Sequence, residues 1–262
     1  MSHSKRDIKV AIITGSARRI GASIAETLHQ QGFHTVIHYN HSKNEAENLV
    51  SRLLQNRADS AVALQADLQS VSDLNTLAES AIAQWGQVDL LVNNASCFYP
   101  TPIASKPATN KTHSEFKIDD WSSIIDTNLR APYILSLLLA DELRKVDGSI
   151  VNLVDIYSER PLKNHSIYNI SKAGMAMITQ TLAMELAPSI RVNGVSPGAI
   201  LWPEGENDTA EQEAAQARIV SQTPLARSGS PNDICKAVSY LVSSEFVTGQ
   251  IIKVDGGRSL HL

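Results

Sequence analysis

The sequence predicts an α/β protein in which helices cover both faces of a parallel sheet. Three observations lead to this fold class. Short aliphatic and β-branched runs alternate with longer amphipathic segments, a glycine-containing turn follows the first run, and 262 residues suit one large domain. The lengths between the short runs fit right-handed strand–helix–strand crossovers. We therefore expect a single domain over 1–262 with a Rossmann-type, doubly wound sheet.

Each element is expected from its local residue pattern. The strands are short apolar runs, at Val10–Ile13, Thr35–His38, Ala61–Leu64, Val88–Val92, Ser149–Val154, Ile190–Val195 and Ile251–Val254. The helices have apolar residues at helical spacing, at Ala22–Gln30, Glu45–Gln55, Val71–Trp85, Trp121–Leu143 and Ser166–Leu186. Two long polar segments, 98–120 and 201–224, break this rhythm. Because both follow strands, we expect them to form walls on the substrate side of the sheet, in preference to surface decoration.

The composition argues against several classes of protein. A formal net charge of −4 gives no basic excess, so no nucleic-acid partner is expected. Cys97 and Cys235 do not form a disulfide framework and fit a reducing compartment. Residues 1–9 have no apolar core of signal-peptide length, and no run approaches the ~20 apolar residues of a membrane helix. These features predict a cytoplasmic protein without membrane contact, and we expect no metal site.

A glycine-containing loop follows the first expected strand and opens the first expected helix. The residues from Thr14 to Gly21 read Thr-Gly-Ser-Ala-Arg-Arg-Ile-Gly. In this context main-chain N–H groups at the helix start face a pyrophosphate, although an ordinary strand–helix turn is the alternative. Arg19 stands where the dinucleotide fingerprint has its middle glycine, and its guanidinium can contact a phosphate. The candidate cofactor residues here are Gly15, Ser16, Arg18, Arg19 and Ile20.

The segment after the second expected strand favours NADPH over NADH. NAD-binding proteins usually carry Asp or Glu about 20 residues beyond the glycine loop, for the ribose 2′-hydroxyl. The corresponding stretch here has no carboxylate, and its imidazoles, amide and hydroxyls suit a 2′-phosphate: His38, Tyr39, Asn40, His41 and Ser42. Asp67, next to Leu68, is expected either to accept from the adenine amino group or to cap the following helix.

Tyr168 and Lys172 are the candidate chemical centre. Their i, i+4 spacing places both side chains on one face of a helix. We expect the ammonium to favour phenolate and so to lower the pKa of Tyr168 towards neutrality. A tyrosine tuned in this way can serve as a general acid for a substrate that receives hydride.

Together these residues resemble the short-chain dehydrogenase/reductase family, and the resemblance covers nearly the whole chain. It includes the glycine loop, Asn93-Asn94-Ala95, Asn128, the Tyr168/Lys172 pair, Pro197-Gly198 and the terminal Val254-Asp255-Gly256-Gly257. The resemblance implies that Asn94 and Ala95 lie against the cofactor and that Asn128 supports a proton-relay water. It implies that Lys172 binds the nicotinamide ribose, and that Pro197 and Gly198 pass the nicotinamide. It also implies a homotetramer built on the helices around 121–143 and 166–186.

One position departs from the family pattern. The family normally has a serine 13 residues before the tyrosine, where this chain has Asp155. A carboxylate cannot donate a hydrogen bond to a ketone oxygen unless it is protonated, so Asp155 favours a substrate with N–H donors or an imine nitrogen. With Arg19 in place of the middle glycine, the His38–Ser42 stretch, the Asn94–Pro102 segment, Tyr168 and Lys172, Asp155 completes a set that resembles the pteridine reductase branch. That resemblance implies a pterin ring stacked on Phe98, contacts from Ser96, and proton handling by Asp155, Tyr168 and Lys172.

The expected reaction is therefore NADPH-dependent reduction of a dihydropterin, with dihydrobiopterin, dihydromonapterin and dihydrofolate as candidate substrates. Trp202 is expected either to cover the pterin or to anchor its loop. His41 stands where the branch often has an arginine for the 2′-phosphate. Two alternatives remain: a reductase of a ketone or 3-oxoacyl thioester, and a cofactor-binding protein without catalysis.

Overall fold

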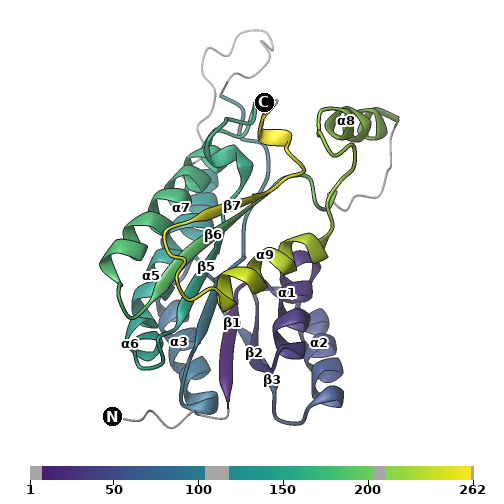
Figure 1. Ribbon diagram of the computed structural model, residues 1–262. Coiled ribbons are helices and arrows are strands. Elements are labelled where there is room, and N and C mark those ends of the chain that lie inside the picture. Colours follow the sequence, from purple (N-terminus) through teal and green to yellow (C-terminus); the bar gives the residue numbers. More distant parts are fainter. Residues whose placement is uncertain (1–7, 104–117, 203–209, 261–262) are drawn as a thin grey trace.

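The computed structural model describes residues 8–103, 118–202 and 210–260, and a parallel sheet lies at its centre (Figure 1). In the described part of the chain, seven strands lie in the order β3-β2-β1-β4-β5-β6-β7, and every pair is parallel. The strands are β1 (Lys9–Ile13), β2 (Phe33–Tyr39), β3 (Ala61–Gln65), β4 (Leu90–Asn93), β5 (Ser149–Leu153), β6 (Arg191–Pro197) and β7 (Ile251–Val254). The predicted fold class is confirmed.

The helices form two layers, one on each face of the sheet (Figure 1). Leucines and alanines of α3 (Val71–Trp85), α5 (Ala131–Leu138), α6 (Ala140–Arg144) and α7 (Ser166–Glu185) pack with sheet residues such as Ile12 and Leu91 in one buried core. On the opposite face, α1 (Arg19–Gln30), α2 (Lys43–Asn56) and α9 (Pro231–Ser243) pack with residues such as Ile13 and Val92. Adjacent strand residues therefore serve opposite cores, as the pleat of a sheet requires.

The strand order places the ligand site between β1 and β4. The chain runs outwards from β1 to β3 and then returns to β4 on the other side of β1. This reversal leaves a crevice at the carboxyl ends of the two central strands, where loops diverge in opposite directions. The glycine loop after β1 and the Asn94–Phe98 segment after β4 therefore meet at that edge.

The predicted helix over Trp121–Leu143 is interrupted in the structure. It divides into α4 (Ile118–Ile125), a π-type turn η1 (Asp126–Arg130), α5 and α6. Such π-type turns are often found at functional sites, and this one carries Asn128. Short η2 (Ile156–Ser158) and η3 (Arg258–Leu260) follow β5 and β7.

Two further helices were not predicted. Helix α9 begins with a capping box in which Ser230 and Asp233 satisfy each other's main-chain N–H groups, with proline at its first turn. This signal was present in the sequence. Helix α8 (Ala210–Ser221) occupies part of the expected 201–224 wall. Residues 104–117 and 203–209 of the two expected walls lie outside the described residues.

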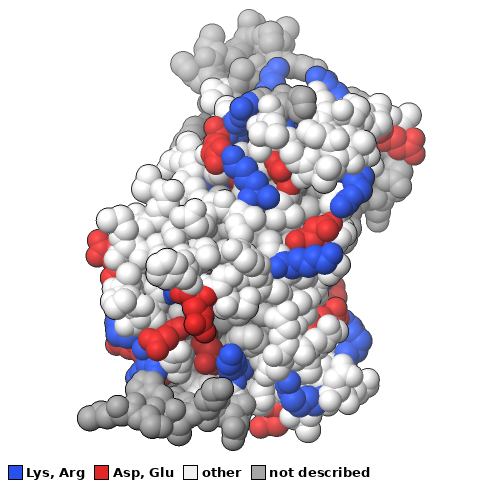
Figure 2. Space-filling model, viewed as in Figure 1, with Lys and Arg blue, Asp and Glu red and all other residues white. Residues whose placement is uncertain are grey.

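The charged side chains are mixed in sign on the face shown in Figure 2. Lysines and arginines lie among aspartates and glutamates, and an uncharged area crosses the middle of this face. Among the described helices, none combines the length and apolar character needed to span a bilayer.

Candidate active site

The glycine loop is held against the segment after β4. Gly15 adopts a left-handed φ of 62°, and a Cβ there would lie 2.9 Å from the Cα of Ala95, so glycine is required on both counts. The Asn94 side-chain amide donates to the carbonyls of Thr14 and Gly15, at 2.9 and 3.1 Å. Gly21 has no room for a side chain because the same amide and the Gly15 carbonyl crowd it. The loop is thus fixed by β4 before any ligand binds.

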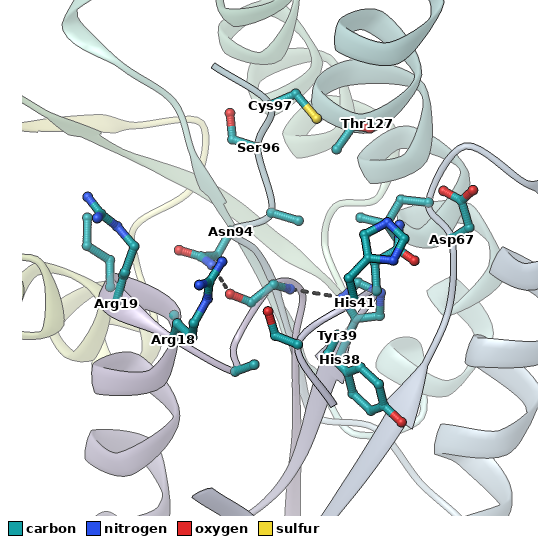
Figure 3. A pocket seen from close by; sticks show the side chains of 18 of the residues that line it. Arg18, Arg19, His38, Tyr39, His41, Asp67, Asn94, Ser96, Cys97 and Thr127 are labelled. Atoms are coloured by element: carbon teal, nitrogen blue, oxygen red, sulfur yellow. Dashed lines mark hydrogen bonds between the residues drawn. The ribbon is translucent and has the colours of Figure 1, made fainter. Parts of the chain in front are cut away.

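A cavity of about 610 Å³ opens beside this loop (Figure 3). Arg18 and Arg19 lie on one side of it, His41 and Asp67 lie on the other, and Ser96 lies towards its far end. Most predicted cofactor residues line it, namely Gly15, Arg18, Arg19, Ile20, His38, Tyr39, Asn40, His41, Ser42, Asp67, Leu68, Asn94, Ala95 and Ser96. The sequence did not single out three further lining residues, Ala17, Gln69 and Thr127.

Some predicted cofactor residues do not line this cavity. Ser16 is fully buried and pins the loop, because its hydroxyl donates to the Ile13 carbonyl at 2.7 Å. Pro197 is the last residue of β6, and Gly198 follows it, where a Cβ on Gly198 would lie 2.7 Å from the Cα of Asp255. Tyr168 and Lys172 are buried on α7.

The contacts around Asp67 and Arg19 bear on two of the sequence expectations. Ser70 caps α3 by accepting from the Asp73 N–H, so Asp67 is not the cap of that helix. Arg19 adopts a left-handed φ of 57°, and its guanidinium donates to the main-chain carbonyl of Trp202 at 3.1 Å. Arg19 therefore ties the glycine loop to the segment after β6, and Trp202 is joined to the cavity wall through its main chain.

Asp155, Tyr168 and Lys172 meet where β5 ends against α7. The Tyr168 hydroxyl donates to Asp155 Oδ2 at 2.8 Å, and the Tyr157 N–H donates to Asp155 Oδ1 at 2.9 Å. The Lys172 ammonium donates to the Leu153 carbonyl at 2.9 Å and lies 5.7 Å from the centre of the Tyr168 ring. The i, i+4 spacing on α7 thus brings both side chains to the end of β5, as the sequence predicts.

The expected lowering of the pKa of Tyr168 is wrong. Burial first, and then the neighbouring Asp155 carboxylate, raise the pKa of Tyr168 well above its usual value. Burial also raises the pKa of Asp155, against hydrogen bonds from the Tyr157 N–H and the Tyr168 hydroxyl. A buried carboxylate beside a buried phenol disfavours a second negative charge. The pair therefore retains its proton at neutral pH, and the Tyr168 hydroxyl stays protonated.

Burial lowers the pKa of Lys172 to about 8, against the attraction of Asp155. In the unfolded chain the lysine keeps its ordinary pKa of 10.5, so at neutral pH it is charged in both states and the buried charge destabilises the fold. This cost disappears as the pH rises from about 8 to 10.5, because the folded protein then loses the proton before the unfolded chain does. The pKa difference corresponds to about 3 kcal/mol, and the lost hydrogen bond to Leu153 offsets about 1 kcal/mol of it. We expect Lys172→Met to raise the unfolding free energy by about 2 kcal/mol at pH 7, with a smaller gain at pH 9.5.

Urea unfolding at the two pH values checks this expectation. The matched control is Lys253→Met, because Lys253 pairs with Glu159 at 2.6 Å on the surface, where such pairs contribute about 0–1 kcal/mol. A Lys172→Met protein that is less stable than the wild type at pH 7, or equally stabilised at both pH values, would contradict the burial cost.

Asn128 on the π-type turn joins three elements and is fully buried. Its amide oxygen accepts from the Cys97 N–H at 2.7 Å, and its nitrogen donates to the Cys97 carbonyl at 2.9 Å and to the Ser171 hydroxyl at 3.1 Å. It therefore fixes the segment after β4 relative to α7, and so fixes the distance between Ser96 and Tyr168.

Phe98 lies directly beside Tyr168. Its ring meets Tyr168 edge-on at 4.7 Å between centroids, and it stacks on His165 at 4.8 Å with an interplanar angle of 13°. Phe98 is 49% exposed, so part of its aromatic surface remains accessible to a ligand. The sequence did not single out His165, which directly precedes α7 and lies three residues before Tyr168.

The cavity fits a dinucleotide cofactor by its shape and donors. It is lined by residues that follow β1, β3 and β4 and by the end of β2, and the glycine cradle has no room for a Cβ at Gly15 or Gly21. Two arginines and several hydroxyl, amide and imidazole groups face it, a set that suits phosphates and ribose. Arg18 and Arg19 would hold the pyrophosphate, and Tyr39 to Ser42 would hold the adenosine end. When bound, a nicotinamide dinucleotide supplies a hydride.

The fold and this site together define a nicotinamide-dependent oxidoreductase. The chain belongs to the short-chain dehydrogenase/reductase family: a family model described as enoyl-(acyl carrier protein) reductase matches residues 15–259. Pteridine reductase 1 of Leishmania tarentolae is 35% identical over 96% of this chain and 96% of its own length.

Relatives with other activities match over similar lengths. Glucose 1-dehydrogenase 2 of Bacillus subtilis is 30% identical over 97% of this chain and 95% of its own length. The 3-oxoacyl-(acyl-carrier-protein) reductase FabG of Staphylococcus aureus (strain Mu50) is 31% identical over 95% of this chain and 97% of its own length. Family membership therefore leaves the substrate to be argued from the site.

Proposed function

We propose that this protein is an NADPH-dependent reductase of dihydropterins. Dihydrobiopterin, dihydromonapterin and dihydrofolate are the candidate substrates. The observation that carries the proposal is the contact between Asp155 Oδ2 and the Tyr168 hydroxyl at 2.8 Å, at a position where a serine would polarise a ketone oxygen. The similarity to a pteridine reductase over 96% of the chain supports the same substrate class.

The chemistry of the three buried groups favours a nitrogen as the proton acceptor. Tyr168 with its raised pKa is a weak acid, and a ring nitrogen accepts a proton from a weak acid more readily than a ketone oxygen does. Asp155 holds the phenol by its hydroxyl and can accept from substrate N–H groups. Lys172 supplies positive charge beneath the Tyr168 ring. We assign proton donation to Tyr168, substrate orientation to Asp155, and ribose binding to Lys172.

Phe98 is proposed as the platform on which the flat heteroaromatic ring stacks. One of its faces is covered by His165, and its half-exposed ring lies at 4.7 Å from Tyr168. Aromatic stacking contributes about 0.5–1.5 kcal/mol beyond burial, so we expect Phe98→Leu to raise the KM for dihydropterin about two- to tenfold. Phe98→Tyr retains the ring and is the matched control. Steady-state kinetics with both variants checks this, and an unchanged KM in Phe98→Leu would contradict the stacking role.

A substrate panel tests the proposed function directly. NADPH oxidation is followed by absorbance with dihydrobiopterin, dihydromonapterin, dihydrofolate and an acetoacetyl thioester in parallel. The proposal predicts turnover with at least one pterin-type substrate and none with the thioester. Turnover of the thioester alone would overturn it and leave family membership standing.

A second candidate function is reduction of a ketone or a 3-oxoacyl thioester. It is favoured by the 31% identity to a 3-oxoacyl-(acyl-carrier-protein) reductase. Asp155 opposes it, because an ionised carboxylate repels a developing alkoxide. The thioester arm of the panel measures this alternative.

We propose NADPH as the preferred cofactor because no carboxylate occupies 38–43. We also propose a homotetramer, since Tyr133 and Leu137 on α5 and Met177 and Met184 on α7 leave apolar side chains exposed. Light scattering of the purified protein tests the oligomer, and a monomer would contradict it. The free cysteines Cys97 and Cys235 support a cytoplasmic location, which fractionation of the source cells would test.

A further inference from the structure

We infer that His38 is a positioning residue that shapes the phosphate-binding loop from beneath, without contacting the cofactor's 2′-phosphate itself. His38 lies near the end of β2 and is 2% exposed. Its position at the end of the second strand makes it a candidate for phosphate contact by sequence. In the structure, however, its ring is turned into the protein. The inference depends on dinucleotide binding, which belongs to the family, and not on pterin as the substrate.

Three hydrogen bonds connect His38 to its neighbours. The Gly15 N–H donates to His38 Nδ1 at 2.9 Å, and the Ser16 N–H donates to the His38 carbonyl at 2.9 Å. On its other side, His38 Nε2 lies 3.1 Å from the Ala66 carbonyl, at the end of β3. The ring therefore bridges the glycine loop and the end of β3, and Figure 3 draws the hydrogen bond to His38 as a dashed line.

These partners determine the tautomer of the imidazole. A main-chain N–H can only donate and a carbonyl can only accept, so Nδ1 is bare and Nε2 carries the proton. Protonation of Nδ1 would remove the acceptor for the Gly15 N–H. Burial lowers the pKa of His38 to about 4, which keeps this neutral form at physiological pH. Besides His38, the charged or titratable groups lining the same cavity are Arg18, Arg19, Tyr39, His41, Asp67 and Cys97. Both ring nitrogens of His38 bond instead to main-chain atoms.

The Gly15 N–H is consequently directed away from the cavity. Its amide donates its hydrogen bond to His38, and Gly15 has a left-handed φ of 62° that only glycine adopts without strain. Other groups of the loop would therefore bind the phosphate. His38 holds these groups in position through its hydrogen bonds to Gly15 and Ser16. Few side chains offer one acceptor and one donor at opposite ends: aliphatic residues offer neither, and Lys or Asp offers only one kind.

Dissociation constants for both NADPH and NADH separate positioning from phosphate contact. We expect His38→Leu to weaken both cofactors by the same factor, about tenfold or more, because a buried N–H loses its partner. His38→Gln keeps an acceptor and a donor and should recover part of the loss. The matched control is His41→Gln, since His41 is exposed and lines the cavity. It should weaken NADPH more than NADH.

Two results would overturn the inference. One is a His38→Leu protein that loses NADPH affinity while NADH affinity stays at the wild-type value, which would make His38 a reader of the 2′-phosphate. The other is wild-type affinity for both cofactors. If His38→Leu does not fold, ¹⁵N NMR of the wild-type ring decides. The inference requires a bare Nδ1 and a protonated Nε2 from about pH 5 to 8, with and without saturating NADPH. A ring that becomes doubly protonated when NADPH binds would overturn it.

Discussion

Tyr168→Phe is expected to abolish turnover of every accepted substrate while leaving NADPH binding at its wild-type affinity. The substitution removes one oxygen atom, the donor to Asp155 Oδ2, and leaves the ring in contact with Phe98. General acid catalysis by a positioned side chain contributes about 10²–10⁴-fold, so kcat should fall by about 10³-fold. The loss should fall on kcat more than on KM, because the proton moves only in the transition state.

Tyr157→Phe provides the control for this prediction. Tyr157 lies two residues after Asp155 and is partly buried, but it reaches the carboxylate through its main-chain N–H, which phenylalanine retains. Its removal should leave kcat close to the wild-type value. Single-turnover kinetics and cofactor titrations of both variants make the comparison. Substantial pterin turnover by Tyr168→Phe would assign the proton donor to another group.

The features that sequence predicts well here are local. Each expected strand overlaps an observed one, and the i, i+4 pair of Tyr168 and Lys172 lies on one helix face because helical geometry alone fixes that relation. The predicted end of β1 at Ile13 also placed the glycine loop correctly. These results follow from residue periods and turn chemistry, which act over a few residues.

The features that sequence predicts poorly depend on distant neighbours. The pKa of Tyr168 is raised by burial and by Asp155 across the β5–α7 contact, and the nearby Lys172 on the same helix does not determine the direction of this shift. The imidazole of His38 is a chemical type that suits a phosphate ligand. Its orientation, however, depends on Gly15 and Ala66, which come from other parts of the chain. The π-type turn after Ile125 likewise carries Asn128, whose buried side chain contacts Cys97 and Ser171 from other parts of the chain.

Asp155→Ser is expected to exchange one substrate class for another. The serine would restore the residue that the family usually has at this position, with a hydroxyl that can donate to a ketone oxygen. It would also remove the carboxylate whose charge and hydrogen bond raise the pKa of Tyr168, so that pKa should move back down. Pterin reduction should fall by about 10²–10⁴-fold, and reduction of a ketone or thioester should rise above its wild-type level.

The comparison with Asp155→Asn separates the two causes. Asparagine keeps the shape of the side chain and an oxygen that can accept from the Tyr157 N–H, but it has no charge and no hydroxyl. It should lose pterin reduction as the serine variant does, without gaining ketone reduction. If Asp155→Ser retained wild-type pterin turnover, the carboxylate would not orient the substrate. If both variants gained ketone reduction equally, removal of the charge alone would explain the change, since a buried negative charge beside the phenol opposes any developing alkoxide.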